Sequence, residues 1–248
     1  MNIPEKVQFF YNSIIDEYVK LKKDHFQINH IEEYNMKKMI LSDIGDKILL
    51  DIGCGLGYHL KTYSLNTKQS YGIDLSEKNI EFAKTNTPKS ILFVGNFLDF
   101  DFGDKKFDVI AASLVLHYCS LSEKKTFFEK VYRLLNDGGI FIWSHKNPVI
   151  EGINFTTESE DDYLDVWKIQ KTNGYYENDK LKYKTFFGFE MPKYHTTMEK
   201  FMELIIQNNF KIIDYSDCFP DPKSRQINQK EFEYYSLLPQ FMICKLQK

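Results

Sequence analysis

The sequence predicts one doubly wound α/β domain, in which helices cover both faces of a mainly parallel β-sheet. Three observations favour this class. Short apolar runs alternate with helix-like segments from residue 47 to about residue 144. The first of these runs stops at Asp51 and passes directly into three glycines at alternate positions. A chain of 248 residues, 43% of them hydrophobic, can bury such a core without disulfides.

The N-terminal segment, residues 5–41, is predicted to be helical. Its apolar and aromatic residues recur with the spacing of an amphipathic helix. Such a face most often packs against the rest of a domain.

The loop after the first predicted strand carries the most specific signal. Gly53, Gly55 and Gly57 allow positive φ angles and lack the Cβ atoms that would keep a ligand away. The spacing D-x-G-x-G-x-G differs from the G-x-G-x-x-G of dinucleotide sites, and no Gly-Lys-Ser/Thr follows as in a phosphate loop. The acid at Asp51 instead suits a cationic or amine-bearing ligand.

This loop resembles motif I of the class I S-adenosylmethionine-dependent methyltransferases, and later segments resemble that family in the same order. Residues 71–75 resemble its second strand, which ends in the acid that holds both ribose hydroxyls, here Asp74. A carboxylate is a natural bidentate acceptor for such a diol. Residues 91–97 resemble the third strand, 107–118 the fourth strand with its loop, and 136–144 the fifth.

The resemblance implies S-adenosylmethionine as cofactor, S-adenosylhomocysteine as product, and a Rossmann-like seven-stranded sheet whose last strand is antiparallel. Adenine is expected against Asn96 and the Phe97 amide. The family usually has an acid where this chain has Asn96, so Asp99 is an alternative. The other expected cofactor contacts are Tyr11 or Tyr18 from the N-terminal segment, Asp51, Gly53, Cys54, Gly55 and Gly57 from the loop, Leu75 beside Asp74, and the Ser113 backbone.

The chain is interpreted as a single methyltransferase domain in four parts. Residues 1–44 form a helical lid, residues 45–144 the cofactor-binding core, residues 145–196 a substrate-covering insertion, and residues 197–248 a helix and strands that complete the sheet. The insertion is inferred because this segment is longer than a normal strand-to-helix connection.

Within the insertion, residues 174–189 predict an antiparallel hairpin around an Asn178-Asp179 turn. The aromatic residues of this region either pack the insertion onto the domain or line a pocket for an apolar or aromatic acceptor. After it we expect a helix over residues 197–208 and strands near residues 210–215 and 241–246.

Three histidines are candidates for a general base, because each is expected at the carboxyl edge of the sheet, where open α/β sheets bind ligands. His195 is the first choice, since a similar Tyr-His-x-Thr stretch lies near the acceptor pocket in small-molecule members of the family. His145 is the second, and His117 can simply pack against the cofactor's methionine part. The remaining histidines, His25, His30 and His59, are interpreted as structural.

Composition and charge limit the kinds of partner and compartment expected for this protein. The four cysteines lack C-x-x-C spacing, which favours reduced thiols in a cytoplasmic protein and no metal site. A net charge of −3 offers nothing for a nucleic-acid partner, and neither a signal peptide nor a membrane span is expected. Asn147-Pro148 resembles the motif of nucleic-acid amine methyltransferases, but it follows the fifth strand instead of the fourth, so we interpret it as a strand stop.

The sequence therefore predicts methyl transfer to an oxygen or nitrogen of a small-molecule acceptor. Such an enzyme aligns the acceptor, excludes water and removes a proton. Two alternatives stay open. A protein methyltransferase would need an open groove, and a non-catalytic regulatory or scaffold protein would bind the cofactor without transfer. The sequence carries no signal of oligomeric state.

Overall fold

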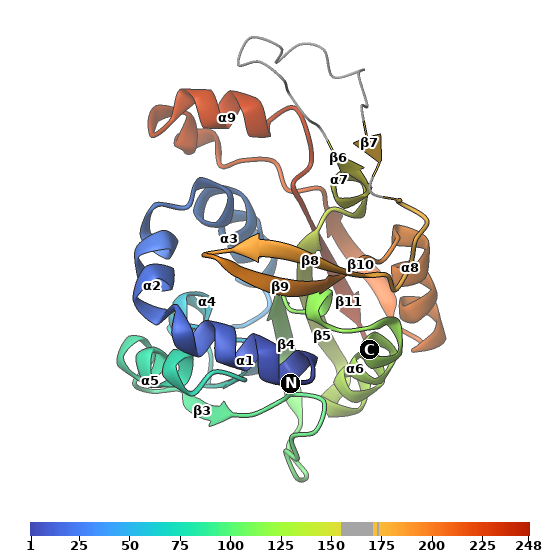
Figure 1. Cartoon of the computed structure of the whole chain (residues 1–248). Helices are drawn as coiled ribbons and strands as arrows, with labels where there is room; N and C mark the ends of the chain where they lie inside the picture. Colours follow the sequence, from blue (N-terminus) through green and yellow to red (C-terminus); the bar gives the residue numbers. More distant parts are fainter. Residues whose placement is uncertain (155–170, 173) are drawn as a thin grey trace.

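A computed structural model of the protein describes residues 1–154, 171–172 and 174–248. Its centre is a seven-stranded sheet with strand order β10-β11-β5-β4-β1-β2-β3, which confirms the predicted fold class (Figure 1). Only β11 is antiparallel to its neighbours within this sheet, as predicted. The strands are β1 (Ile48–Ile52), β2 (Gln69–Asp74), β3 (Ile91–Val94), β4 (Phe107–Ser113), β5 (Leu135–Lys146), β10 (Lys211–Ser216) and β11 (Phe241–Gln247).

The strand order reverses direction at β1, which pairs with β2 on one side and with β4 on the other. The connections that leave the carboxyl ends of β1 and β4 therefore diverge. A crevice between such connections is where open α/β sheets bind ligands.

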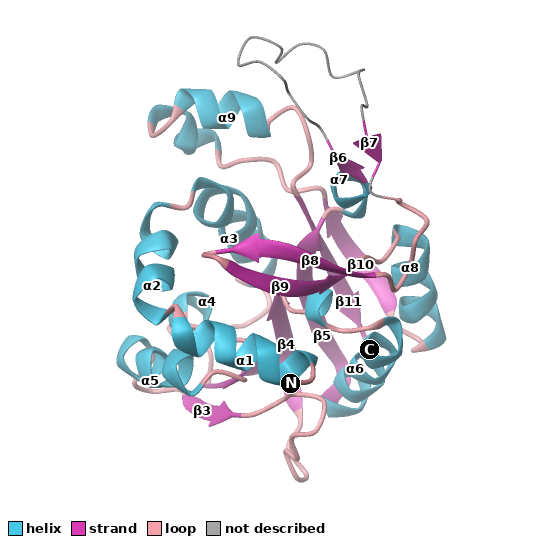
Figure 2. Cartoon of the chain, in the orientation of Figure 1, coloured by secondary structure: helices cyan, strands magenta, loops and turns pink. Residues whose placement is uncertain are grey.

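Two apolar layers cover the sheet because successive side chains of a strand point to opposite faces. Leu50 packs in the layer that includes Phe127 and Phe201, whereas Leu49 packs in the layer that includes Met36 and Leu60. The first layer is covered by α6 (Leu121–Leu134) and α8 (Met198–Gln207), and the second by α3 (Glu33–Ile40), α4 (Tyr58–Tyr63) and α5 (Glu77–Asn86) (Figure 2).

The N-terminal segment is helical, as predicted, but it is broken twice. Its elements are α1 (Ile3–Ser13), α2 (Ile15–Asp24), a five-residue π-helix (Ile28–Glu32) and α3. The break at His25 has an extended backbone, and the Asn29 amide satisfies the carbonyls of Lys22 and Lys23 at the end of α2. The break turns the chain, so that α1 and α2 lie over the carboxyl ends of the strands (Figure 1).

The hairpin of the insertion consists of β8 (Leu181–Phe186) and β9 (Phe189–Tyr194). Its turn is Phe187-Gly188, with φ angles of +48° and +77°, so the hairpin does not turn at Asn178-Asp179 as predicted. Those two residues form a separate turn before β8. A two-residue turn of type I′ needs two positive φ angles, and Gly188 adopts one without strain. Asn178 instead accepts a hydrogen bond from the Thr197 amide at 2.8 Å, at the start of α8.

The hairpin lies beside α1 across the carboxyl edge of the sheet (Figure 1). The ring of Phe189 contacts that of Phe10 edge-on, with 5.5 Å between centroids. Residues 155–170 and 173 of the predicted insertion lie outside the described residues. The remaining short elements are a 3-10 turn (Leu116–Tyr118), α7 (Pro148–Gly152), β6 (Ile153–Asn154), β7 (Lys171–Thr172), a second 3-10 turn (Pro222–Gln226) and α9 (Gln229–Tyr235).

Among the described residues, no helix is both long enough and apolar enough to cross a membrane.

Candidate functional site

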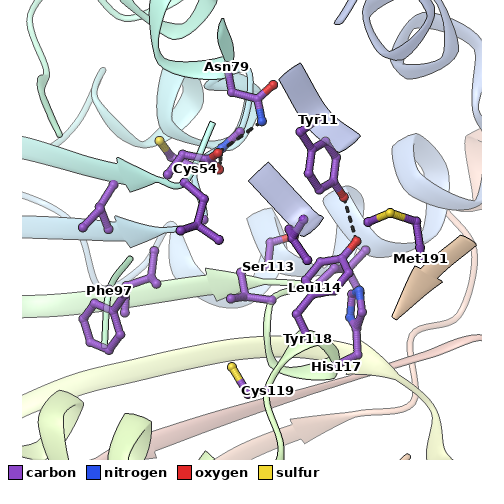
Figure 3. A pocket seen from close by; sticks show the side chains of 18 of the residues that line it. Tyr11, Cys54, Asn79, Phe97, Ser113, Leu114, His117, Tyr118, Cys119 and Met191 are labelled. Carbon is purple, nitrogen blue, oxygen red and sulfur yellow. Dashed lines mark hydrogen bonds between the residues drawn. The ribbon is translucent and has the colours of Figure 1, made fainter. Parts of the chain in front are cut away.

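A cavity of about 360 Å³ lies at the carboxyl ends of β1, β2, β4 and β5, under α1, α2 and the β8–β9 hairpin (Figure 3). All but one of the predicted cofactor residues line it. They are Tyr11, Tyr18, Asp51, Gly53, Cys54, Gly55, Asp74, Leu75, Asn96, Phe97 and Ser113.

Gly57 is the predicted residue that does not line the cavity. It precedes α4 with a φ of +81°, and a Cβ atom there would lie 3.1 Å from the Cβ atom of Ala83 on α5. Its position indicates that this glycine brings α4 close to α5.

The glycine loop is held against β2. The amides of Gly53 and Cys54 both donate to the Ile73 carbonyl, at 2.8 and 3.1 Å. Gly53 has a φ of +67°, and a Cβ atom on it would lie 2.4 Å from Cγ2 of Val115. A Cβ atom on Gly55 would meet nothing within 4 Å, so the space beside it opens into the cavity. The loop thus presents bare backbone to a ligand.

Asp74 is fixed by three hydrogen bonds at the end of β2. Its Oδ2 accepts from the Gly55 amide at 2.9 Å, and its Oδ1 accepts from the Ser76 amide at 2.9 Å and from Asn79 Nδ2 at 3.2 Å. Burial raises the pKa of this carboxyl, and the three donors oppose that rise. Oδ2 keeps one acceptor site, which suits a hydroxyl in the cavity.

Asp51 is the penultimate residue of β1, and its side chain is buried. The residue is 2% exposed, and Oδ2 has no hydrogen-bond partner among the described residues. Burial raises its pKa to about 7, and the negative charges of Glu32 and Asp74 add to that rise. A carboxyl in this state stabilises a cationic ligand group that enters the cavity, because the ligand supplies the partner that the fold leaves out.

Sequence reasoning missed a buried polar network beneath the cavity, centred on Glu32 and His59. Glu32 Oε2 lies 3.1 Å from His59 Nε2, and Oε1 accepts from the hydroxyls of Ser113 at 2.7 Å and Ser144 at 2.5 Å. Burial opposes ionisation of Glu32, but His59 and the Ser144 hydroxyl lower its pKa to about 2. Burial also opposes ionisation of His59, but the Glu32 carboxylate raises the pKa of its ring. The Tyr63 hydroxyl lies 3.1 Å from His59 Nδ1.

This network ties the N-terminal segment to the ends of β4 and β5. His59, interpreted as structural from the sequence, lines the cavity through it. The signal in the sequence was the spacing of His59 and Tyr63, which share one face of α4 at positions i and i+4. Nothing in the sequence marked Glu32, because its partners come from three other elements.

Both predicted tyrosines lie at the roof of the cavity. The hydroxyl of Tyr11 on α1 is 2.8 Å from that of Tyr118, which follows β4, and the rings of Tyr11 and Tyr18 pack edge-on (Figure 3). Burial raises the pKa of each of the three hydroxyls. The hydrogen bond closes α1 onto the core.

At the β3 end, Asn96 and Phe97 line the cavity, and Asp99 does not. Asp99 instead accepts a hydrogen bond from the Asn96 amide at 2.7 Å, and Asn96 Oδ1 accepts from the Leu98 amide at 3.2 Å. Asp99 therefore orients the Asn96 amide.

The three predicted histidines are not brought together at the cavity. His117 lines it, and burial holds the pKa of its ring well below the usual value. Neither His145 nor His195 is part of the described lining. His145 donates from Nδ1 to the Lys146 carbonyl at 2.7 Å, and burial lowers its pKa to about 4. His195 donates from Nε2 to the Tyr175 carbonyl at 2.7 Å.

The insertion contributes mainly cationic and aliphatic groups to the cavity. Lys184, Met191, Pro192 and Lys193 line it, whereas Tyr183, Phe187, Phe189 and Tyr194 do not. Phe189 packs on Phe9 and Phe10 of α1, and Tyr175 packs on Tyr176.

Comparison with known proteins identifies the same type of scaffold. Residues 50–143 match a family model described as a methyltransferase domain. An uncharacterized Haemophilus influenzae protein is 26% identical, over 100% of this chain and 97% of its own length. The Plasmodium falciparum phosphoethanolamine N-methyltransferase is 25% identical, over 82% of this chain and 85% of its own length.

Solved structures agree. A Listeria monocytogenes protein assigned as an S-adenosylmethionine-dependent methyltransferase superposes with a TM-score of 0.74 at 25% identity, over 88% of this chain and 96% of its own.

Three other curated relatives match only part of this chain, and the matches span 45–61% of their own lengths.

Proposed function

We propose that this chain is a class I S-adenosylmethionine-dependent methyltransferase that methylates an oxygen or nitrogen of a small-molecule acceptor. The observation that carries the proposal is that one roofed cavity contains both the cofactor loop and further space under the hairpin. The hydrogen bond between Tyr11 and Tyr118 and the contact of α1 with β9 close that roof. A small acceptor fits under such a roof, whereas a protein substrate needs an open groove.

The residues present fit the cofactor. We assign Asp51 to its amino group, Asp74 to its ribose, and Asn96 with the Phe97 amide to its adenine. Asp51 is the strongest of these assignments, because its buried carboxyl lacks a partner within the described chain. When bound, S-adenosylmethionine supplies a methyl group that its sulfonium already activates.

The chain's own task is then to align the acceptor, exclude water and take up a proton. The α1–hairpin roof excludes water, and holding the acceptor in line with the methyl group accounts for most of the rate. We assign proton uptake to His117, since its ring lines the cavity, stays neutral at physiological pH and has no partner at Nδ1 among the described residues. His145, which packs 5.9 Å from it ring to ring, and His195 then support this wall of the site.

A nitrogen is the favoured accepting atom on one further observation. The Plasmodium falciparum relative that aligns with most of this chain is an N-methyltransferase. An amine is a nucleophile only after it loses its proton, which is the step assigned to His117.

The test of this function starts with calorimetric titration of the protein with S-adenosylmethionine, with NADH as the control ligand. We expect saturable binding of S-adenosylmethionine alone, followed by transfer of a labelled methyl group in a screen of amines and hydroxyl compounds. If S-adenosylmethionine does not bind, the proposed function fails.

Replacement of His117 by glutamine should lower turnover by about 10²–10⁴-fold while the Kd for S-adenosylmethionine stays unchanged. The physical reason is that the amide cannot take up the acceptor's proton. The matched control is His30→Gln, at a histidine that does not line the cavity. Equal turnover in the two variants would remove His117 from the mechanism.

The affinity for S-adenosylmethionine should rise with pH between about pH 6 and 7.5. The pKa of Asp51 in the free protein is about 7, so below that pH the carboxyl is protonated and cannot pair with the ligand's ammonium group. Each unit of pH below 7 should therefore weaken binding by up to about tenfold. The rise in affinity with pH should end near pH 8, where the ligand's own amino group loses its proton.

Calorimetric Kd values over this pH range check the expectation, with Asp51→Asn as the comparison. The amide does not titrate in this range, so the variant should bind weakly and with a much flatter pH dependence. A wild-type affinity that does not change with pH would contradict the assignment of Asp51 to the amino group.

A further inference from the structure

A group of cationic side chains gathers at the end of the cavity under α2 and the hairpin. Lys22 comes from α2, His25 from the break after it, Lys146 from the end of β5 and Lys184 from β8. All four line the cavity that also contains the cofactor loop. Three of these segments therefore bring a lysine charge to the cavity, and the fourth adds a histidine ring.

These groups lie close enough to act on one another. Burial lowers the pKa of Lys146 to about 8, and the charges of Lys184 and Lys193 lower it further. Burial also lowers the pKa of His25, as do the charges of Lys22, Lys146 and Lys184. The fold therefore brings the half-buried ammonium groups of Lys22 and Lys146 and the exposed one of Lys184 to one cavity, and their repulsion costs free energy unless an anion is supplied.

The described chain does not supply that partner. Within the described residues, Lys22, Lys146 and Lys184 have no carboxylate oxygen within 4 Å of their ammonium groups. The Lys146 ammonium group lies 5.8 Å from the centre of the Phe241 ring. Lys193 differs, because it is paired with Glu151. The uncompensated charge at this end of the cavity thus belongs to Lys22, Lys146 and Lys184.

The cofactor accounts for only one of these charges. Lys22 acts electrostatically on Asp51 and Glu32, and Asp51 is assigned to the amino group of the cofactor's methionine part. We therefore assign Lys22 to the carboxylate of that methionine part. Asp51 and Asp74 already face the cofactor's amino group and ribose. Lys146 and Lys184, with His25 beside them, remain for a second anion.

We propose that the acceptor carries an anionic group, a carboxylate or a phosphate, which binds between Lys146 and Lys184 beside His25. The inference rests on the proposed function and adds the acceptor's chemical class to it. Ammonium groups on flexible stems suit either anion as point charges. Docking this group at the far end places the rest of the acceptor toward the cofactor loop. It also explains why cationic residues of the hairpin, and not its aromatic ones, line the cavity.

The direct test measures anion binding to the protein saturated with S-adenosylhomocysteine. Benzoate and inorganic phosphate are the two probes, titrated separately by calorimetry so that carboxylate and phosphate are distinguished. We expect at least one of them to bind saturably. The variant Lys146→Met/Lys184→Met should weaken that binding by about tenfold or more, because the anion loses both ammonium groups that we propose to hold it.

The matched control is Lys89→Met/Lys105→Met, which removes the same charge from exposed positions away from the cavity. It should bind the probe as the wild type does. Affinity for S-adenosylhomocysteine should be retained in both double variants, which shows that they fold. The inference is overturned if the two double variants bind the anion equally, or if the wild type does not bind it. In either case, retained binding of S-adenosylhomocysteine leaves the proposed function standing. Failure of S-adenosylhomocysteine to bind the wild type overturns both.

A labelled-methyl screen gives an independent readout. Each candidate acceptor is offered as the free acid and as its neutral amide or ester. The wild type should prefer the acid by about tenfold or more in kcat/KM, and Lys146→Met/Lys184→Met should lose that preference through KM. A preference for the neutral form in the wild type would overturn the inference.

Discussion

Replacement of Asp74 by alanine is expected to weaken S-adenosylmethionine binding by about ten- to a hundredfold, which corresponds to about 1–3 kcal/mol for an unsatisfied buried polar group. The variant loses the acceptor assigned to the ribose. It also leaves the Gly55 amide without its partner, and this amide belongs to the loop that faces the cofactor. Calorimetric Kd values for S-adenosylmethionine measure the effect, with Asp104→Ala as an exposed control in the same protein.

The two contributions can be separated. Asn79→Ala removes only the side-chain donor to Asp74 Oδ1, and it should reduce affinity far less than the loss of the carboxylate. Asp74→Asn keeps the shape but offers one acceptor oxygen in place of two, so an intermediate affinity is expected. An unchanged Kd in Asp74→Ala would show that ribose is not held there.

Replacement of Gly53 by alanine is expected to reduce both stability and cofactor binding. The new Cβ atom would sit 2.4 Å from Cγ2 of Val115, and the backbone would keep a φ of +67°. The left-handed conformation costs a non-glycine residue about 1–2 kcal/mol, and overpacking against the valine adds about 1–3 kcal/mol. Thermal unfolding and S-adenosylmethionine titration measure the two consequences.

A matched glycine isolates the steric part. Gly103 has a φ of +61°, and a Cβ atom on it would meet nothing within 4 Å, so Gly103→Ala should lose only the backbone contribution. Val115→Ala combined with Gly53→Ala should recover the difference. If Gly53→Ala and Gly103→Ala unfold with the same loss of stability, the contact with Val115 does not matter.

Local patterns explain why the core of the site could be predicted. The apolar strand that ends in Asp51 and the glycines after it are contiguous in the chain, and Asp74 closes the next strand. Strand order in a doubly wound sheet then brings these carboxyl ends to one edge. Gly53, Gly55, Asp74 and Asn96 therefore line one cavity, and their contact with the cofactor stays a prediction.

The hairpin shows where local patterns mislead. Asn178-Asp179 is a strong turn signal, and Asp179 does have a positive φ, but the strands pair around Phe187-Gly188. The choice between two available turns depends on which strands find each other and pack against α1. That is settled by contacts between segments far apart in the sequence.

The sequence by itself predicted the α/β class, the resemblance to methyltransferases and the cofactor loop, because each depends on residues close together in the chain. The tertiary structure decided which of the three candidate histidines lines the cavity, how Glu32 pairs with His59, and that Lys146 and Lys184 line the same cavity. The physical reason is that charge and hydrogen bonding depend on distance in space. Side chains from helices, strand ends and the hairpin come within that distance only after the chain has folded.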